Sequence, residues 1–146
     1  MKKVLIVAAD YYLNTTRALV VDAKLLLNKS KIKYETIYVP GVFEIPVVIS
    51  KYIKKYDGFI ALGIVIKGET PHFDFICQST FDTIMSIAVN SKKPIGNGII
   101  TALNMSQAIN RSGDPESVID KKYLDKGKGK EAAKAVIAVF KNVPKK

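Results

Sequence analysis

The sequence predicts an α/β fold: a three-layer α/β/α sandwich around a four-stranded parallel sheet. Short apolar runs, typical of strands covered on both faces, alternate along the chain with segments whose apolar residues recur at helical spacing. Strands that alternate with helices favour a parallel sheet with helices on both faces. The chain has 146 residues, 48% of them apolar, which fits a single packed domain over residues 1–146.

Four segments have the composition of strands: residues 4–9, 33–39, 59–66 and 94–100. The first is a continuous apolar run, as expected for a central strand. The second contains β-branched and aromatic residues and is ended by Pro40 and Gly41. The fourth is interrupted by Gly96 and Gly98, which indicate a bulge or a close approach of another backbone.

Five segments have apolar residues at helical spacing: 15–28, 45–56, 75–90, 105–110 and a last one marked between residues 132 and 140. We expect Thr15 or Thr16 to cap the first helix, and Gly113 resembles a C-cap of the fourth. Residues 67–72 are expected to form a loop, and 114–126 a polar, irregular segment. With right-handed crossovers, this order of elements predicts a flavodoxin-like sandwich.

The charge pattern favours a solvated, lysine-rich surface. The formal net charge is +10, and nine of the 23 basic residues lie between Lys121 and Lys146. Such a balance is also compatible with a nucleic-acid partner, but grooves for nucleic acid favour arginine, and Arg17 and Arg111 are the only two here. No apolar run approaches the length of a membrane helix, and the apolar stretch before Asp10 is short for a secretory signal.

Cysteine and histidine are scarce, which restricts the chemistry. Cys77 is the only cysteine, so no internal disulfide is possible, and we expect it in the core of a cytoplasmic protein. His72 is the only histidine, so no zinc site is expected. Neither a GxGxxG motif nor a P-loop occurs.

Ligands of open α/β sheets bind beyond the carboxyl ends of the strands. This rule selects the loops 9–14, 40–44 and 67–74 and the end of the fourth strand, 97–104. His72, in the third of these loops, can exchange protons near neutral pH. If the loop is extended, Thr70, His72 and Asp74 share one side, and Asp74 can orient the imidazole. The alternative is an ordinary loop histidine.

Other residues near these loops have both a structural and a functional interpretation. Tyr11 is either an ordinary aromatic at a strand end or a platform for a flat heterocycle. Glu44 either complements a helix dipole or binds substrate. Arg111 either stabilises the end of a short helix or clamps a phosphate. Lys126, Lys128 and Lys130 precede the last helix, either as a flexible basic loop or as a phosphate site.

Four motifs resemble one family: GVFEIP at 41–46, ALGIVIKGETPHFD at 61–74, QAINRSG at 107–113 and KGKEAA at 128–133. They are similar, in order and spacing, to the lumazine synthase (6,7-dimethyl-8-ribityllumazine synthase) family. The resemblance implies a transferase of the penultimate step of riboflavin biosynthesis, without cofactor or metal. In that step 5-amino-6-(D-ribitylamino)uracil condenses with 3,4-dihydroxy-2-butanone 4-phosphate, and phosphate and water are released.

The resemblance also implies roles for individual residues. Tyr11 would stack on the pyrimidine, and His72 would donate and accept protons. The uracil and ribityl chain would be contacted by Gly41, Val42, Phe43 and Glu44. The pyrimidine site would be lined by Val65, Ile66 and Lys67, and the phosphate cradled by Gly68, Glu69 and Thr70.

In this family the pocket lies between adjacent subunits, so three residues are expected from the neighbour: Asn97, Arg111 and Lys128. Arg111 would bind the phosphate and Lys128 would assist at the ribityl side. The segment between them is longer than is common in the family, so Lys126 competes with Lys128 for that role. This length, and a start of the chain close to the first strand, lead us to expect a pentamer or decamer, with riboflavin synthase as a downstream partner.

Three other functions are alternatives to this one. A flavin carrier or receiver-type module would use the same fold and loops, but the loop after the first strand lacks glycine and a Ser/Thr-rich phosphate cradle before Thr15. A nucleic-acid-binding protein would show salt-dependent binding. Archaeal-type riboflavin synthase shares the fold and would make riboflavin from lumazine alone.

Overall fold

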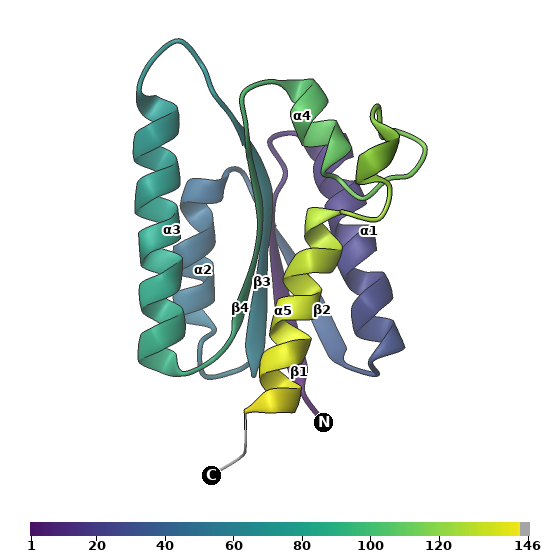
Figure 1. Cartoon of the computed structure of the whole chain (residues 1–146). Helices are drawn as coiled ribbons and strands as arrows, with labels where there is room; N and C mark the ends of the chain where they lie inside the picture. The colour runs from purple at the N-terminus through teal and green to yellow at the C-terminus, as the bar shows by residue number, and fades with distance from the viewer. Residues whose placement is uncertain (144–146) are drawn as a thin grey trace.

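The chain forms a four-stranded parallel sheet between two layers of helices, as the computed structural model of residues 1–143 shows (Figure 1). The sheet order is β2-β1-β3-β4, and every neighbouring pair is parallel. The strands are β1 (Lys3–Ala9), β2 (Lys33–Val39), β3 (Gly58–Ile66) and β4 (Ile95–Ala102). The helices are α1 (Leu13–Lys29), α2 (Ile45–Lys51), α3 (His72–Ser91), α4 (Met105–Asn110) and α5 (Lys128–Asn142), with short 3₁₀ turns η1 (Val42–Glu44) and η2 (Lys121–Tyr123). The predicted three-layer α/β fold is confirmed.

Alternation along β1 divides the core into two halves. Val4, Ile6 and Ala8 pack in one hydrophobic cluster with α1, α4 and α5, whereas Leu5 and Val7 pack in another with α2 and α3. The side chains of Val4 through Ala8 are fully buried. A strand covered on both faces has no polar side to show, which is why its sequence is a continuous apolar run.

The close approach predicted at the glycines of β4 is confirmed. A Cβ at Gly96 would overlap the carbonyl oxygen of Ala132 and lie 2.8 Å from its carbonyl carbon, and one at Gly98 would overlap a methyl of Leu62. The register of β4 on β3 is continuous from Ile95 to Ala102, so there is no bulge. These glycines let α5 lie directly on β4.

Three helix boundaries differ from the prediction. Neither Thr15 nor Thr16 caps α1: the helix begins at Leu13, and the buried Thr16 hydroxyl donates to the carbonyl of Ala9 at 2.9 Å. Helix α2 ends at Lys51 rather than near residue 56. Beyond this end the Lys93 ammonium donates to the carbonyls of Ile53 (2.6 Å) and Tyr56 (2.8 Å), so a distant side chain satisfies two carbonyls of the segment that follows the helix.

The third boundary is at α3, which begins at His72 instead of Phe75. The predicted bounds of α4, residues 105–110, are confirmed, but its C-cap is Arg111 and not Gly113. Gly113 lies two residues farther along, in a left-handed turn with φ +87° that favours glycine. The following segment is irregular apart from η2.

Among residues 1–143, no helix combines the length and the apolar character that a membrane crossing requires.

Candidate functional site

Three loops follow the carboxyl ends of β1, β2 and β3, and the first two are packed against each other and against β3. A Cβ at Gly63 in β3 would lie 2.8 Å from a methyl of Val42 and 3.0 Å from the Cβ of Ala9, so these chain segments are in contact. The N–H of Asp10 donates to the carbonyl of Val39 at 2.9 Å. Most of the predicted site residues lie at or after the ends of these strands, and we term them the loop group: Tyr11, Gly41, Val42, Phe43, Glu44, Val65, Ile66, Lys67, Gly68, Glu69, Thr70 and His72.

Two aromatic rings of the loop group are open to solvent. Tyr11 is 76% exposed and Phe43 is 62% exposed. The Tyr11 ring meets Tyr12 edge to face, with centroids 4.9 Å apart. Large apolar rings are normally buried, so two exposed rings at the ligand-binding edge of the sheet are available to stack on a flat ligand.

Glu44 has a structural partner within its own turn. Its Oε1 accepts the N–H of Gly41 at 2.9 Å and closes η1. The carboxylate therefore holds residues 41–44 in one conformation, and its second oxygen is not used in that bond. Both interpretations of Glu44 from the sequence are compatible with this geometry.

The loop from Lys67 to Thr70 is exposed and leads into the N-terminus of α3. Its start is anchored because the Lys67 N–H donates to the carbonyl of Ala102 at 2.9 Å. A Cβ at Gly68 would meet no atom within 4 Å, so open space surrounds that backbone. The free N–H groups and positive dipole end of a 20-residue helix, with an adjacent lysine, suit an anion.

His72 lies exposed in the first turn of α3, and its N–H donates to the Thr70 hydroxyl at 3.4 Å. The expectation that Thr70, His72 and Asp74 share one side is wrong. His72 and Asp74 are helical, so their side chains project about 200° apart around the helix axis.

Cys77 is half-buried, so the expectation that it lies in the core is wrong. Burial and the nearby negative charge of Asp74 raise the pKa of its thiol.

The remaining predicted residues form a second group, the α5 group: Asn97, Arg111 and Lys128. The N–H of Lys128 donates to the carbonyl of Arg111 at 2.9 Å. A Cβ at Gly98, next to Asn97, would lie 3.2 Å from the Lys128 carbonyl oxygen. Asn97 is the third residue of β4, so it lies toward the amino end of the strand and not at the carboxyl edge we expected.

Asp22, which the sequence analysis did not identify, fixes the start of α5. Its Oδ2 accepts the N–H of Lys130 at 2.8 Å, and Gly113 and Gly127 pack against the same carboxylate. Burial raises the pKa of Asp22, although the hydrogen bond from Lys130 and the charges of Lys130 and Lys134 act in the opposite direction. An aspartate amid apolar residues of an amphipathic helix was the available sequence signal.

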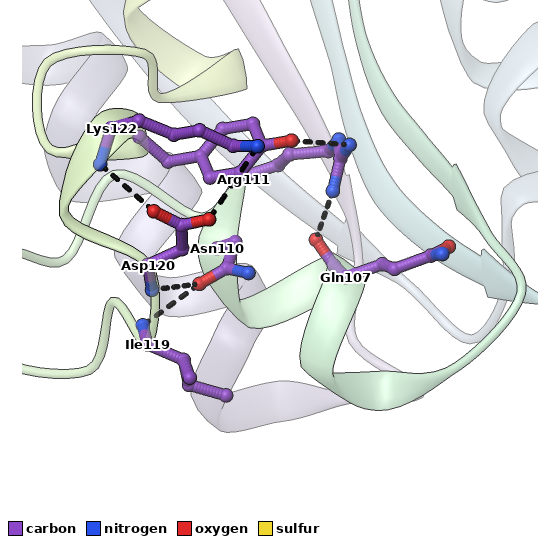
Figure 2. A network of polar contacts seen from close by, with 7 residues as sticks. Gln107, Asn110, Arg111, Ile119, Asp120 and Lys122 are labelled. Carbon is purple, nitrogen blue, oxygen red and sulfur yellow. Dashed lines mark hydrogen bonds and ion pairs between the residues drawn. The ribbon is translucent and has the colours of Figure 1, made fainter.

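Arg111 is held by its own chain (Figure 2). One terminal nitrogen donates to the carbonyl of Gln107 at 2.9 Å and the other to the hydroxyl of Tyr123 at 3.3 Å. The guanidinium carbon lies 4.8 Å from the centre of the Tyr123 ring. Tyr123 was also missed, because its nearness to Arg111 depends on how residues 114–126 fold.

His72 and Arg111 lie on different sides of the sheet. His72 begins α3, which packs in the cluster with α2, whereas Arg111 caps α4 and Lys128 begins α5, and both of these helices pack in the opposite cluster (Figure 1). Within residues 1–143, no hydrogen bond or ion pair joins the loop group to the α5 group. Nor do three His, Cys, Asp or Glu side chains of this part of the chain gather to hold a metal ion.

Comparison with known proteins identifies the family. A model of the 6,7-dimethyl-8-ribityllumazine synthase family matches residues 1–143. The 6,7-dimethyl-8-ribityllumazine synthase of Novosphingobium aromaticivorans is 39% identical over 142 residues, covering 96% of this chain and 95% of that protein. The enzyme of Agrobacterium fabrum is 38% identical over 143 residues, which cover 93% of this chain and 90% of that protein. The enzyme of Mycobacterium leprae is 38% identical over 117 residues, which cover 80% of this chain and 73% of that protein. The chain belongs to the 6,7-dimethyl-8-ribityllumazine synthase family.

Proposed function

We propose that the chain performs the lumazine synthase reaction in a pocket that the loop group of one subunit forms with the α5 group of a neighbouring copy. Family membership supports the reaction: 5-amino-6-(D-ribitylamino)uracil condenses with 3,4-dihydroxy-2-butanone 4-phosphate to give the lumazine, phosphate and water. The separation of His72 and Arg111 on opposite sides of the sheet is the observation that carries the shared pocket.

The loop group provides what the pyrimidine and the proton transfers require. Tyr11 offers an open ring for stacking, and Gly41–Glu44 with Val65 and Ile66 supply backbone and apolar contacts around the heterocycle and ribityl chain. His72 exchanges protons as the imine forms and the ring closes. Holding two reactants together is itself worth up to roughly 7–11 kcal/mol in favourable cases.

Both groups contribute to phosphate binding. Lys67, the backbone of Gly68–Thr70 and the N-terminus of α3 present positive potential from the loop group. Arg111 of the neighbouring subunit completes the phosphate site. Two of its five N–H donors are bonded within its own chain, which leaves three for phosphate oxygens. Lys128 and Asn97 approach the ribityl side; Lys126, outside α5, is the alternative lysine.

An uncovered apolar face supports assembly of identical copies. Val47 on α2 and Phe75, Met85 and Val89 on α3 each expose about two thirds of their surface. A groove of about 410 Å³ runs between these helices, lined among others by Phe43, Val47 and Thr83. A face of this kind is typical of a protein interface. We propose that a neighbouring subunit covers it in a pentamer or decamer, and that riboflavin synthase takes up the product.

The direct test is incubation with both substrates, measuring lumazine fluorescence and phosphate release, with Arg111→Ala and His72→Ala in parallel. A charge-assisted hydrogen bond contributes roughly 1.5–3 kcal/mol, so Arg111→Ala is expected to raise KM for the phosphorylated substrate at least about tenfold and that for the pyrimidine little. His72→Ala should lower kcat and leave both KM values nearly unchanged. Equal effects of Arg111→Ala on both substrates would refute a dedicated phosphate ligand.

A further inference from the structure

We propose that Tyr123 is a positioning residue for the phosphorylated substrate: it holds the Arg111 guanidinium in the orientation that binds phosphate. This inference rests on the proposed role of Arg111. Tyr123 lies twelve residues beyond Arg111, in the segment that the sequence analysis expected to be irregular, and nothing in the motifs of the family resemblance includes it.

The contact has two parts. The guanidinium lies over the Tyr123 ring at 4.8 Å, within the range of a cation–π interaction, and one of its nitrogens donates to the phenolic oxygen at 3.3 Å. Stacking engages one flat face of the guanidinium, and three of the five N–H donors at its edges remain after the bonds to Gln107 and Tyr123. Those edges form the fork that matches two oxygens of a phosphate.

The segment that carries Tyr123 is itself folded onto α4. The side-chain oxygen of Asn110, the residue before Arg111, accepts the N–H groups of Ile119 at 2.8 Å and Asp120 at 3.0 Å (Figure 2). Asp120 then caps η2 by accepting the N–H of Lys122 at 3.1 Å, and the Tyr123 N–H donates to the Asp120 carbonyl at 3.0 Å. The ring is thus placed by bonds that begin next to the arginine it contacts.

Restraint of Arg111 matters because a free arginine loses side-chain entropy when it binds. Tyr123 on one side and the carbonyl of Gln107 on the other fix the guanidinium before substrate arrives. Preorganisation of this kind increases affinity without adding a contact to the ligand. In the described residues no carboxylate forms an ion pair with Arg111, so its charge is not neutralised by this arrangement.

The test compares Tyr123→Ala and Tyr123→Phe with Leu124→Ala, an exposed neighbour, as the matched control. Tyr123→Ala is expected to raise KM for the phosphorylated substrate about three- to tenfold, and the inhibition constant of inorganic phosphate by the same factor. KM for the pyrimidine and kcat should stay within about twofold of the starting enzyme. Tyr123→Phe keeps the ring and should restore most of the affinity. Tyr123→Leu replaces the alanine variant if that variant does not assemble.

A double variant that carries Tyr123→Ala and Arg111→Ala distinguishes a failure of the proposed Tyr123 role from a failure of the proposed Arg111 role. In that background Tyr123→Ala should have no further effect on either constant, because the group it positions is gone. If Tyr123→Ala matches Leu124→Ala, or adds its full effect to Arg111→Ala, the positioning role is overturned while Arg111 remains the phosphate ligand. If Arg111→Ala itself leaves both constants unchanged, the proposed function of Arg111 is wrong and the role of Tyr123 falls with it.

Discussion

The buried hydroxyl of Tyr56 makes the stability of this fold depend on pH. Its side chain is 3% exposed, and its hydroxyl donates to Glu35 Oε1 at 2.8 Å. Burial, together with the hydrogen bond and the negative charge of Glu35, raises the pKa of Tyr56 to about 12. The pKa of Glu35 is lowered in turn by its hydrogen bonds with Lys3 and Tyr56.

Stability should therefore fall in alkaline solution through Tyr56. Above pH 10 the phenol ionises in the unfolded chain but stays protonated in the folded one, so the stability it contributes is lost between pH 10 and about 12. Urea unfolding of the protein and of Tyr56→Phe at equal subunit concentration measures this contribution. The variant should be less stable below pH 10, and the difference should shrink by pH 11.5; a constant difference would contradict the assignment.

At the scale of elements, Asp22 joins α1 to α5 and so positions Lys128. Its oxygen satisfies a backbone N–H in the first turn of α5, where partners within the helix are lacking. Asp22→Ala should cost about 1–2 kcal/mol because that N–H loses its acceptor. Urea unfolding measures the loss, and Asp22→Asn, which retains an acceptor oxygen, is the matched control.

The same residue predicts a second pH dependence. Because burial raises the pKa of Asp22, the folded protein binds this proton more tightly than the unfolded chain. Stability from this group is present at low pH and is lost as pH rises above 3.8 through the folded pKa. Relative to the starting protein, Asp22→Asn should gain stability between about pH 4 and pH 7. If Asp22→Asn instead loses stability relative to the starting protein over that pH interval, the fold favours the ionised form of Asp22.

Elements with strong local patterns were predictable, and those decided by distant contacts were not. Strand β2 matches its prediction from Lys33 to Val39, and α4 from Met105 to Asn110. The segment after α2 is bonded by Lys93, some forty residues away, and a contact over that separation is invisible in a local pattern. The early start of α3, with Pro71 at its N-cap, placed His72 and Asp74 on different sides of a helix.

The candidate site was predictable to a similar degree. The carboxyl ends of parallel strands pointed to the loop group, because that rule follows from topology alone. Tyr123 and Asp22 were missed because each acts through a contact that only the folded chain creates: Arg111 with η2, and α1 with the start of α5. How one copy meets the next lies beyond what the periodicity of one sequence reveals.

For the whole molecule, the exposed apolar face of α2 and α3 predicts a closed assembly. Five copies of a 16.1 kDa chain amount to about 80 kDa, and ten to about 160 kDa. Light scattering should find one of these masses. Val47→Lys, on the uncovered face, should reduce the particle size, whereas Lys54→Ala, on a charged surface, should not. A monomer or a particle near one megadalton would contradict the expected assembly.

The shared pocket is tested most directly by mixing His72→Ala with Arg111→Ala subunits after dissociation and reassembly. If each pocket takes His72 from one subunit and Arg111 from the next, random mixing restores both residues in about a quarter of the pockets. Assayed with the phosphorylated substrate far below its KM, the hybrid should recover about a quarter of the starting activity. Activity no higher than that of the two parent variants would mean that both residues act within one chain.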